Sequence, residues 1–158
     1  MGSEKPPVTI RDATVQDAAI LADYNSRLAV ETEGHALHRD TIDAGVAALL
    51  DDPDKGRYWV AEYGGKVVGQ LMVTYEWSDW RNGNLWWIQS VYVHPEFRRI
   101  GVFSALYRHV ESLAMANPGV CGLRLYVDRR NARAQQTYEK LGMTKSRYLV
   151  METMLGEH

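Results

Sequence analysis

The chain has 158 residues, of which 46% are hydrophobic and 24% charged, a balance typical of one globular domain with a buried core. Its 18 Lys and Arg residues against 20 Asp and Glu residues give a net charge of -2, which excludes the basic surplus of a nucleic-acid-binding protein. No apolar run reaches the roughly 18 residues of a membrane span, and the first residues lack a signal-peptide pattern. We therefore expect a cytoplasmic protein with neither a nucleic-acid nor a membrane partner.

The chain has one cysteine, Cys121, so an internal disulfide and a cysteine-cluster zinc site are excluded. Nothing beside Cys121 favours a reactive thiolate, and we predict a small core residue. We expect no metal site. No linker separates domains, so we expect a disordered tail at residues 1–7 and a single domain at residues 8–155.

Helix and strand patterns follow one another along the whole chain. The Gly64-Gly65 pair predicts a hairpin turn, and Gly142 predicts the end of a helix. In chain order, the predicted elements are a strand at 8–10, helices at 14–30 and 40–50, strands at 58–63, 66–76 and 85–93, a helix at 101–116, a strand at 123–127, a helix at 132–141 and a strand at 146–154. This order predicts a mixed sheet flanked by helices.

The strongest chemical signal lies where the predicted strand at 85–93 passes through a basic loop into the next helix. The loop contains Arg98 and Arg99, and the helix begins at Gly101. A helix start offers unpaired backbone N–H groups and the positive end of the dipole, and the arginines add charge, so the segment suits a phosphate group. By itself this pattern also fits an ordinary strand-to-helix turn.

A second segment repeats the order of strand, loop, helix and glycine stop between residues 123 and 143. Asn131, Ala134 and Tyr138 are spaced at i, i+3 and i+7, so they share one helix face. Asn and Tyr are unusual on a face that should meet the core unless a polar group lies against them.

Together the two segments resemble the acyl-CoA-binding motifs of the GNAT superfamily of N-acetyltransferases. The loop reads Arg98-x-x-Gly101-x-Phe103, and the later helix reads Asn131-x-x-Ala134-x-x-x-Tyr138-x-x-x-Gly142-Met143. The resemblance implies an α/β (α+β) fold with a mixed, mostly antiparallel sheet of six to seven strands. About four helices would flank this sheet, which would be splayed between strands four and five. Phe103 stands where the family has a small residue; it changes the start of the helix or is a core residue turned inward.

The resemblance also implies residue roles, with acetyl-CoA as co-substrate. Backbone groups of strand four would pair with pantetheine, and the N–H at or near Val93 would be the oxyanion donor. The loop amides would hold the pyrophosphate, Asn131 would bind the pantetheine arm, and Tyr138 would be the general acid. The implied coenzyme-binding residues are Val91, Tyr92, Val93, Arg98, Arg99, Ile100, Gly101, Val102, Phe103, Ser104, Asn131, Ala134 and Tyr138.

The general base is left open by the sequence, because the fourth strand carries no acid. Glu76 is the preferred candidate at the end of the third strand, and Asp79, Glu31 and Glu33 are further candidates. His94 is an alternative proton relay. Acidic and aromatic residues suit a cationic amine. The expected acceptor-binding residues are Glu31, Glu33, Trp77, Asp79, Trp80 and Gln89. The tryptophans could instead form an apolar patch, and we expect exposed area at Trp80, Trp86 and Trp87 to support a homodimer.

The implied reaction is transfer of an acetyl group from acetyl-CoA to a primary amine of a small molecule, by direct attack in a ternary complex. Two alternatives stay open: a non-catalytic acyl-CoA sensor, and an acetyltransferase acting on a peptide or protein amine. A phosphate-loop nucleotide binder is disfavoured, since no Gly-Lys-Ser/Thr follows the loop.

Overall fold

The structure is a computed structural model, and it describes residues 5–156. Two compact units divide the chain: the first unit ends at Leu125, and the second unit begins at Tyr126. Residues 1–4 of the expected N-terminal tail lie outside the described residues. Within the described range, no helix combines the length and apolar character needed to cross a membrane.

The first unit is built on a five-stranded sheet in the order β1-β2-β3-β4-β5. Neighbours from β1 to β4 are antiparallel, and β5 is parallel to β4. The strands are β1 (Thr9–Asp12), β2 (Arg57–Tyr63), β3 (Lys66–Ser78), β4 (Gly83–Val93) and β5 (Val120–Leu125). The Gly64-Gly65 hairpin joins β2 to β3 as predicted, with φ of 58° and 79° at the two glycines.

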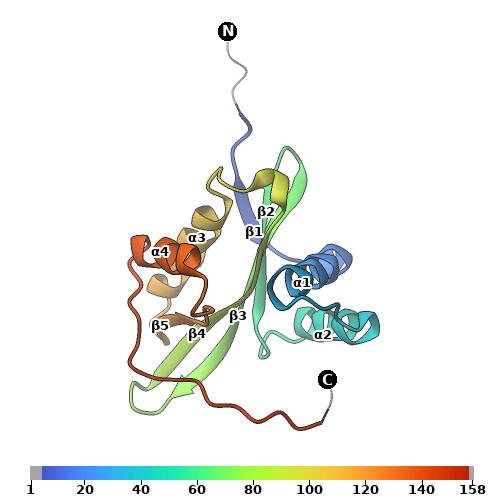
Figure 1. The fold of residues 1–158 in the computed structure, drawn as a ribbon. Coiled ribbons are helices and arrows are strands. Elements are labelled where there is room, and N and C mark those ends of the chain that lie inside the picture. The colour runs from blue at the N-terminus through green and yellow to red at the C-terminus, as the bar shows by residue number, and fades with distance from the viewer. Residues whose placement is uncertain (1–4, 157–158) are drawn as a thin grey trace. The chain divides into compact units, whose positions relative to one another are not determined.

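Helices cover both faces of this sheet (Figure 1). One face carries α1 (Ala18–Glu33) and α2 (Arg39–Asp51), and the opposite face carries α3 (Val102–Ala116). All three were predicted to within a few residues. A short 3₁₀ helix at Val15–Asp17 precedes α1, and the Thr14 N–H donates to the Asp17 carboxylate at 2.7 Å.

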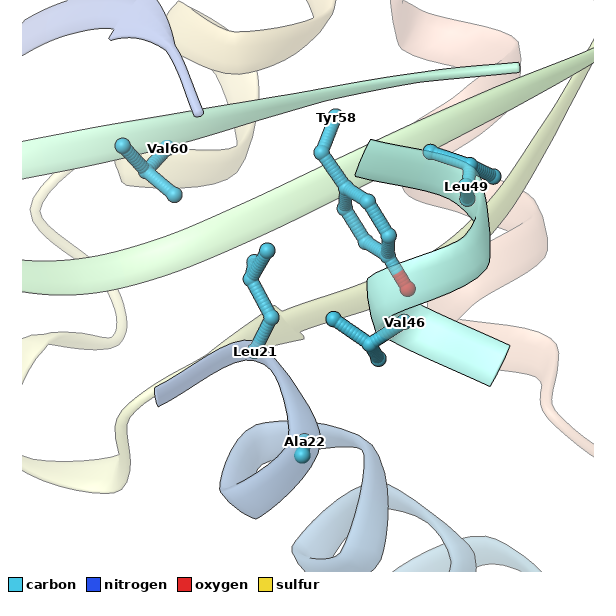
Figure 2. Close-up of a cluster of buried hydrophobic side chains, with 6 residues drawn as sticks. All are labelled: Leu21, Ala22, Val46, Leu49, Tyr58 and Val60. Carbon is cyan, nitrogen blue, oxygen red and sulfur yellow. The ribbon is translucent and has the colours of Figure 1, made fainter. Parts of the chain in front are cut away.

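The face under α1 and α2 is packed by a compact apolar cluster that joins both helices to β2 (Figure 2). Alternation along β2 turns Tyr58 and Val60 toward the helices. All six members of the cluster are at most 9% exposed: Leu21, Ala22, Val46, Leu49, Tyr58 and Val60. This burial fixes α1 and α2 on the sheet.

Helix α3 packs against the other face of the sheet, and its first turn comes very close to Gly69 of β3. A Cβ atom at Gly69 would lie 2.8 Å from Val102 Cγ1, so only glycine lets the helix come this close. Val102, Leu106 and Val110 are at most 2% exposed along the packed stripe. The N-terminus of α3 is therefore fixed beside the middle strands.

The second unit contains the predicted helix α4 (Ala132–Lys140) and a long segment without regular structure. Gly142 ends the helix with φ of 102°, and the Met143 N–H donates to the Tyr138 carbonyl at 3.0 Å. The predicted strand at 146–154 is absent. The expectation of six to seven strands is therefore wrong, because the described sheet has five.

Candidate functional site

Within the first unit, the C-terminal end of β4 is paired on one side only, because it leaves β5 and continues along β3. Parallel pairing with β5 ends at Ile88 and Leu125, while β4 continues to Val93 along β3. In residues 5–125, the backbone edge of β4 from Gln89 to Val93 has no strand beside it on the β5 side. An edge of this kind presents N–H and C=O groups to an extended ligand.

A β-bulge changes the direction of this strand end. The register passes from Met72 opposite Gln89 to Gln70 opposite Tyr92, which inserts one extra residue in β4. Ser90 occupies the left-handed region with φ of 51°, which is uncommon for a residue with a side chain. The fully buried Gln70 donates from Nε2 to the Ser90 carbonyl at 2.9 Å, and this bond holds the bulge.

Polar side chains from α1 and β2 support the same bulge. Asn25 donates from Nδ2 to the Leu21 carbonyl at 2.9 Å and to the Tyr58 hydroxyl at 3.0 Å. Burial raises the pKa of Tyr58, while hydrogen bonds from Asn25 and Ser90 oppose the rise. Because buried polar groups are stable only when they are hydrogen-bonded, this network fixes the bulge in one conformation.

The loop after β4 leads directly into the N-terminus of α3. The His94 N–H donates to the Val68 carbonyl at 2.8 Å, and a 3₁₀ turn at Pro95–Phe97 follows. Arg99 and Gly101 both have positive φ, of 71° and 87°. The N–H groups of the first turn of α3 lack acceptors within their own helix, so they and the dipole suit an anion. The residues present therefore fit a pyrophosphate group.

Phe103 lies in this first turn with its ring packed near Tyr107 of the same helix, at a centroid separation of 6.2 Å. Its side chain is partly buried. Phe103 is not among the buried core residues, and the backbone of the turn is helical.

Arg98 is held by the end of α1 and the end of β4. Its guanidinium donates to Glu31 Oε2 at 2.7 Å and to the Val93 carbonyl at 2.9 Å. The Tyr92 hydroxyl donates to Glu31 Oε1 at 2.9 Å, and the guanidinium carbon lies 5.4 Å from the Tyr92 ring centroid. Burial, together with the bond to Glu31, raises the pKa of Tyr92, so its hydroxyl stays a donor. The three side chains form one cluster, the Glu31–Tyr92–Arg98 cluster.

Glu76, the candidate base, lies on β3. The other expected acceptor residues lie on β3, on β4 or in the turn between them, except Glu33, which ends α1. Glu76 accepts from Arg124 of β5 at 2.9 Å, and Gln89 donates to the Thr74 hydroxyl. Trp77 is 61% exposed and Trp80 is 87% exposed. The side chains of Glu33 and Asp79 are also exposed. The structure thus brings Glu76 and Gln89 onto one sheet face and keeps Glu31 with Arg98.

Two surface predictions are wrong. Trp86 is only 6% exposed, because strand alternation turns it toward Trp59 and Tyr75, at ring separations of 6.0 and 6.2 Å. Cys121 is exposed, since it lies on β5, the last strand of the sheet. The Cys121 thiol donates to the Asn84 carbonyl at 3.4 Å.

In the second unit, α4 carries Ala134 and Tyr138 on one face, and Asn131 lies at its N-terminus. Asn131 caps the helix, and its Oδ1 accepts from the Ala134 N–H at 3.0 Å. This leaves Nδ2 as the side-chain donor that Asn131 can offer to a ligand. Burial raises the pKa of Tyr138, so its hydroxyl stays protonated beyond the ordinary range of a tyrosine.

Sequence reasoning missed three residues that shape the site. Gln70, Asn25 and Arg124 are polar residues within apolar strand or helix patterns. A polar residue in such a pattern indicates a buried polar contact, and this signal was present in the sequence. Their partners lie 20 to 48 residues away along the chain. Spacing alone does not connect groups so far apart.

Comparison with known proteins matches residues 19–143 to the model of the Acetyltransferase (GNAT) family. Phosphinothricin N-acetyltransferase of Streptomyces viridochromogenes is 30% identical over 146 residues, covering 91% of this chain and 78% of that enzyme. Thialysine N-epsilon-acetyltransferase of Bos taurus is 34% identical over 97 residues, covering 61% of this chain. The match spans 52%, about half, of the bovine enzyme.

Solved structures agree with this assignment. The crystal structure of a possible acetyltransferase from Clostridium difficile 630 has a TM-score of 0.89 and 44% sequence identity, covering 98% of this chain and 100% of that chain. The matched family model includes β4, the basic loop, α3 and α4. The chain belongs to the Acetyltransferase (GNAT) family.

Proposed function

We propose that this protein transfers the acetyl group of acetyl-CoA to a primary amine of a small molecule, by direct attack in a ternary complex. Membership of the family supports acetyl transfer. The names of two relatives specify N-acetylation of small compounds, phosphinothricin and thialysine, which supports a small amine as acceptor. For this chain we propose a chemical class of acceptor, a small primary amine.

The observation that carries the proposal is the course of β4 into α3. The edge from Gln89 to Val93 would pair with the amides of pantetheine, and the N–H at or near Val93 would donate to the thioester oxygen. The basic loop and the first turn of α3 would bind the pyrophosphate. In the second unit, Asn131 Nδ2 would donate to the pantetheine arm, and Tyr138 would donate to the sulfur.

Acetylation of an ammonium group removes two protons from its nitrogen and supplies one proton to the departing thiolate. A primary amine has a pKa near ~10.4, so roughly four molecules in ten thousand are neutral at pH 7. Glu76 would accept the ammonium proton, directly or through water, and the amine nitrogen would attack the carbonyl carbon. The carbon–nitrogen bond forms, the carbon–sulfur bond breaks, and the Tyr138 hydroxyl protonates the departing thiolate. The attacking nitrogen gives up its second proton as the amide forms, and that proton restores the Tyr138 hydroxyl directly or through water.

We expect Glu76→Gln to lower kcat/KM for the amine about 10²-fold at neutral pH, because the amide cannot accept the ammonium proton. Steady-state kinetics across pH should show the loss shrinking as pH rises toward the pKa of the amine, where the neutral nucleophile becomes abundant. Glu111→Gln is the matched control, because Glu111 is a carboxylate on α3 that also pairs with an arginine. A Glu76→Gln enzyme with unchanged kcat/KM would contradict the role of Glu76.

A panel of amines tests the whole proposal. Thiol release from acetyl-CoA should be measured with diamines, amino acids, amino sugars and peptide N-termini, alongside acetyl-CoA binding by calorimetry. Turnover with a small amine supports the proposal, and turnover with peptides alone favours a peptide acceptor. Binding without turnover favours an acyl-CoA sensor, an alternative that the ion pairing of Glu31 and Glu76 makes worth testing. Absence of acetyl-CoA binding would overturn all three.

A further inference from the structure

Gln70 of β3 is a polar residue in a part of the sheet that is otherwise apolar and closed to solvent. Its side chain is fully buried, and the equally buried Val60 of β2 lies opposite it. Its Nε2 donates to the Ser90 carbonyl at 2.9 Å, whereas among the described residues its Oε1 has no hydrogen-bond partner. A buried amide oxygen without a donor destabilises a fold. An apolar residue of similar size would avoid this penalty, so stability does not account for a glutamine here.

The hydrogen bond from Gln70 reaches a β4 residue with a strained backbone. Ser90 has φ of 51°, and a residue with a side chain disfavours the left-handed backbone about 5- to 30-fold. Ser90 is one of two β4 residues that lie opposite the single residue Leu71 of β3, so it belongs to the bulge. Tyr58 contacts the side chain of Ser90, whereas Gln70 binds its carbonyl. The glutamine therefore acts on the backbone of the bulge itself.

The bulge determines which backbone N–H groups of β4 face its open edge. The N–H groups of a strand alternate between its two edges, so one extra residue changes the edge that the later groups face. The bulge lies within the edge from Gln89 to Val93, where the pantetheine and the thioester would bind. If Ser90 returned to an extended backbone, the pairing would shift by one residue, and the N–H at or near Val93 would turn away from this edge.

We propose that Gln70 is a positioning residue for acetyl transfer. Its amide holds Ser90 in the left-handed conformation and thereby aims the N–H at or near Val93 at the thioester oxygen. The role rests on the proposed function, since that function places the thioester at the edge of β4. Gln70 acts through the backbone of Ser90 and not by contact with a substrate, because its side chain is fully buried. The unpartnered Oε1 is then a loss of stability that accompanies a functional backbone geometry.

Gln70→Met removes the amide and keeps an unbranched side chain of similar length. We expect kcat for amine acetylation to fall about 10-fold in single-turnover kinetics, because the left-handed state of Ser90 loses its hydrogen bond. The melting temperature should not fall, because the substitution removes a buried polar oxygen that has no partner. Ser78→Ala is the matched control, since Ser78 is another buried polar residue of β3, at the end of the strand, and kcat should stay unchanged. A Gln70→Met enzyme that loses stability and keeps kcat would overturn the proposal.

Substitutions at Ser90 separate positioning from packing. Ser90→Gly permits positive φ without a penalty, whereas Ser90→Ala keeps the penalty of a Cβ atom. Both substitutions remove the hydroxyl that contacts Tyr58, so the two variants differ in their backbone preference. Gln70→Met should therefore lower kcat about 10-fold when combined with Ser90→Ala, and less than about 3-fold when combined with Ser90→Gly. Equal losses in the two backgrounds would overturn the proposal, because they would show that the glutamine does not act through φ of Ser90.

Nuclear magnetic resonance reads the same backbone without any substrate. The three-bond coupling between the N–H and Hα protons of Ser90 depends on φ, so it should change from a left-handed to an extended value in Gln70→Met and stay constant in Ser78→Ala. An unchanged coupling in Gln70→Met would overturn the proposal.

The original chain separates this role from the proposed function. If the original chain neither binds acetyl-CoA nor acetylates any amine of the panel, the proposed function fails, and the role of Gln70 fails with it. If the original chain is active and Gln70→Met leaves its kcat unchanged, only the role of Gln70 fails.

Discussion

Replacing Tyr138 with phenylalanine is expected to lower kcat about 10²-fold and to leave acetyl-CoA affinity nearly unchanged. The substitution removes the hydroxyl that would protonate the departing thiolate, and it keeps the ring. General-acid assistance is worth about 10²–10⁴-fold, and a thiolate needs it less than an alkoxide does. Single-turnover kinetics measure the chemical step, and calorimetry measures the affinity.

The pH profile adds a second readout. Because burial raises the pKa of Tyr138, the hydroxyl should remain protonated to a pH above the ordinary value near ~10, and the alkaline decline of kcat should begin above it. The phenylalanine variant should lack that decline. Tyr75→Phe is the matched control, since burial also raises the pKa of Tyr75, which packs against Trp86. A Tyr138→Phe enzyme with the original kcat would show that the residue only packs.

Gly101→Val is expected to raise the dissociation constant for acetyl-CoA at least 10-fold. Gly101 has φ of 87°, a conformation that a β-branched residue strongly disfavours. An added Cβ would meet no atom within 4 Å, so the penalty comes from the backbone and not from a clash. The loop would relax by turning the first N–H groups of α3 away from the pyrophosphate. Calorimetry with acetyl-CoA measures the change.

Gly65→Val supplies a matched control. Gly65 has φ of 79°, and its Cβ would also meet no atom within 4 Å, but it lies in the hairpin between β2 and β3. Both variants should lose a comparable amount of thermal stability, and only Gly101→Val should lose affinity. A folded Gly101→Val protein with the original affinity would contradict the placement of the pyrophosphate at this loop.

Local patterns predicted the elements whose signals lie within a few residues. The hairpin at Gly64-Gly65 and the stop at Gly142 depend on turn chemistry, and the helix expected at 101–116 depends on helical spacing; all three were confirmed. The strand expected at 146–154 was wrong, since alternation describes a side-chain pattern but does not supply a partner strand. Strand pairing is decided by distant residues, which a pattern within nine residues does not contain.

In the candidate site, too, local motifs were recognised from the sequence and contacts between distant residues were not. The loop at Arg98 to Gly101 and the face of Asn131 and Tyr138 were recognised from spacing, and their roles remain predictions. The contact between Glu31 and Arg98 joins residues 67 positions apart, and no local pattern indicates it. Trp86 was misplaced because composition counts aromatic residues without telling which sheet face they occupy.

The Glu31–Tyr92–Arg98 cluster would couple the affinities of the two substrates to each other. Arg98 has one guanidinium, and a phosphate bound at the proposed loop would compete with Glu31 for it. If the coenzyme draws Arg98 away, the Glu31 carboxylate at the end of α1 would gain a net negative charge that would attract a cationic amine. Thermodynamic linkage makes the effect reciprocal, so each substrate should tighten the binding of the other by the same factor.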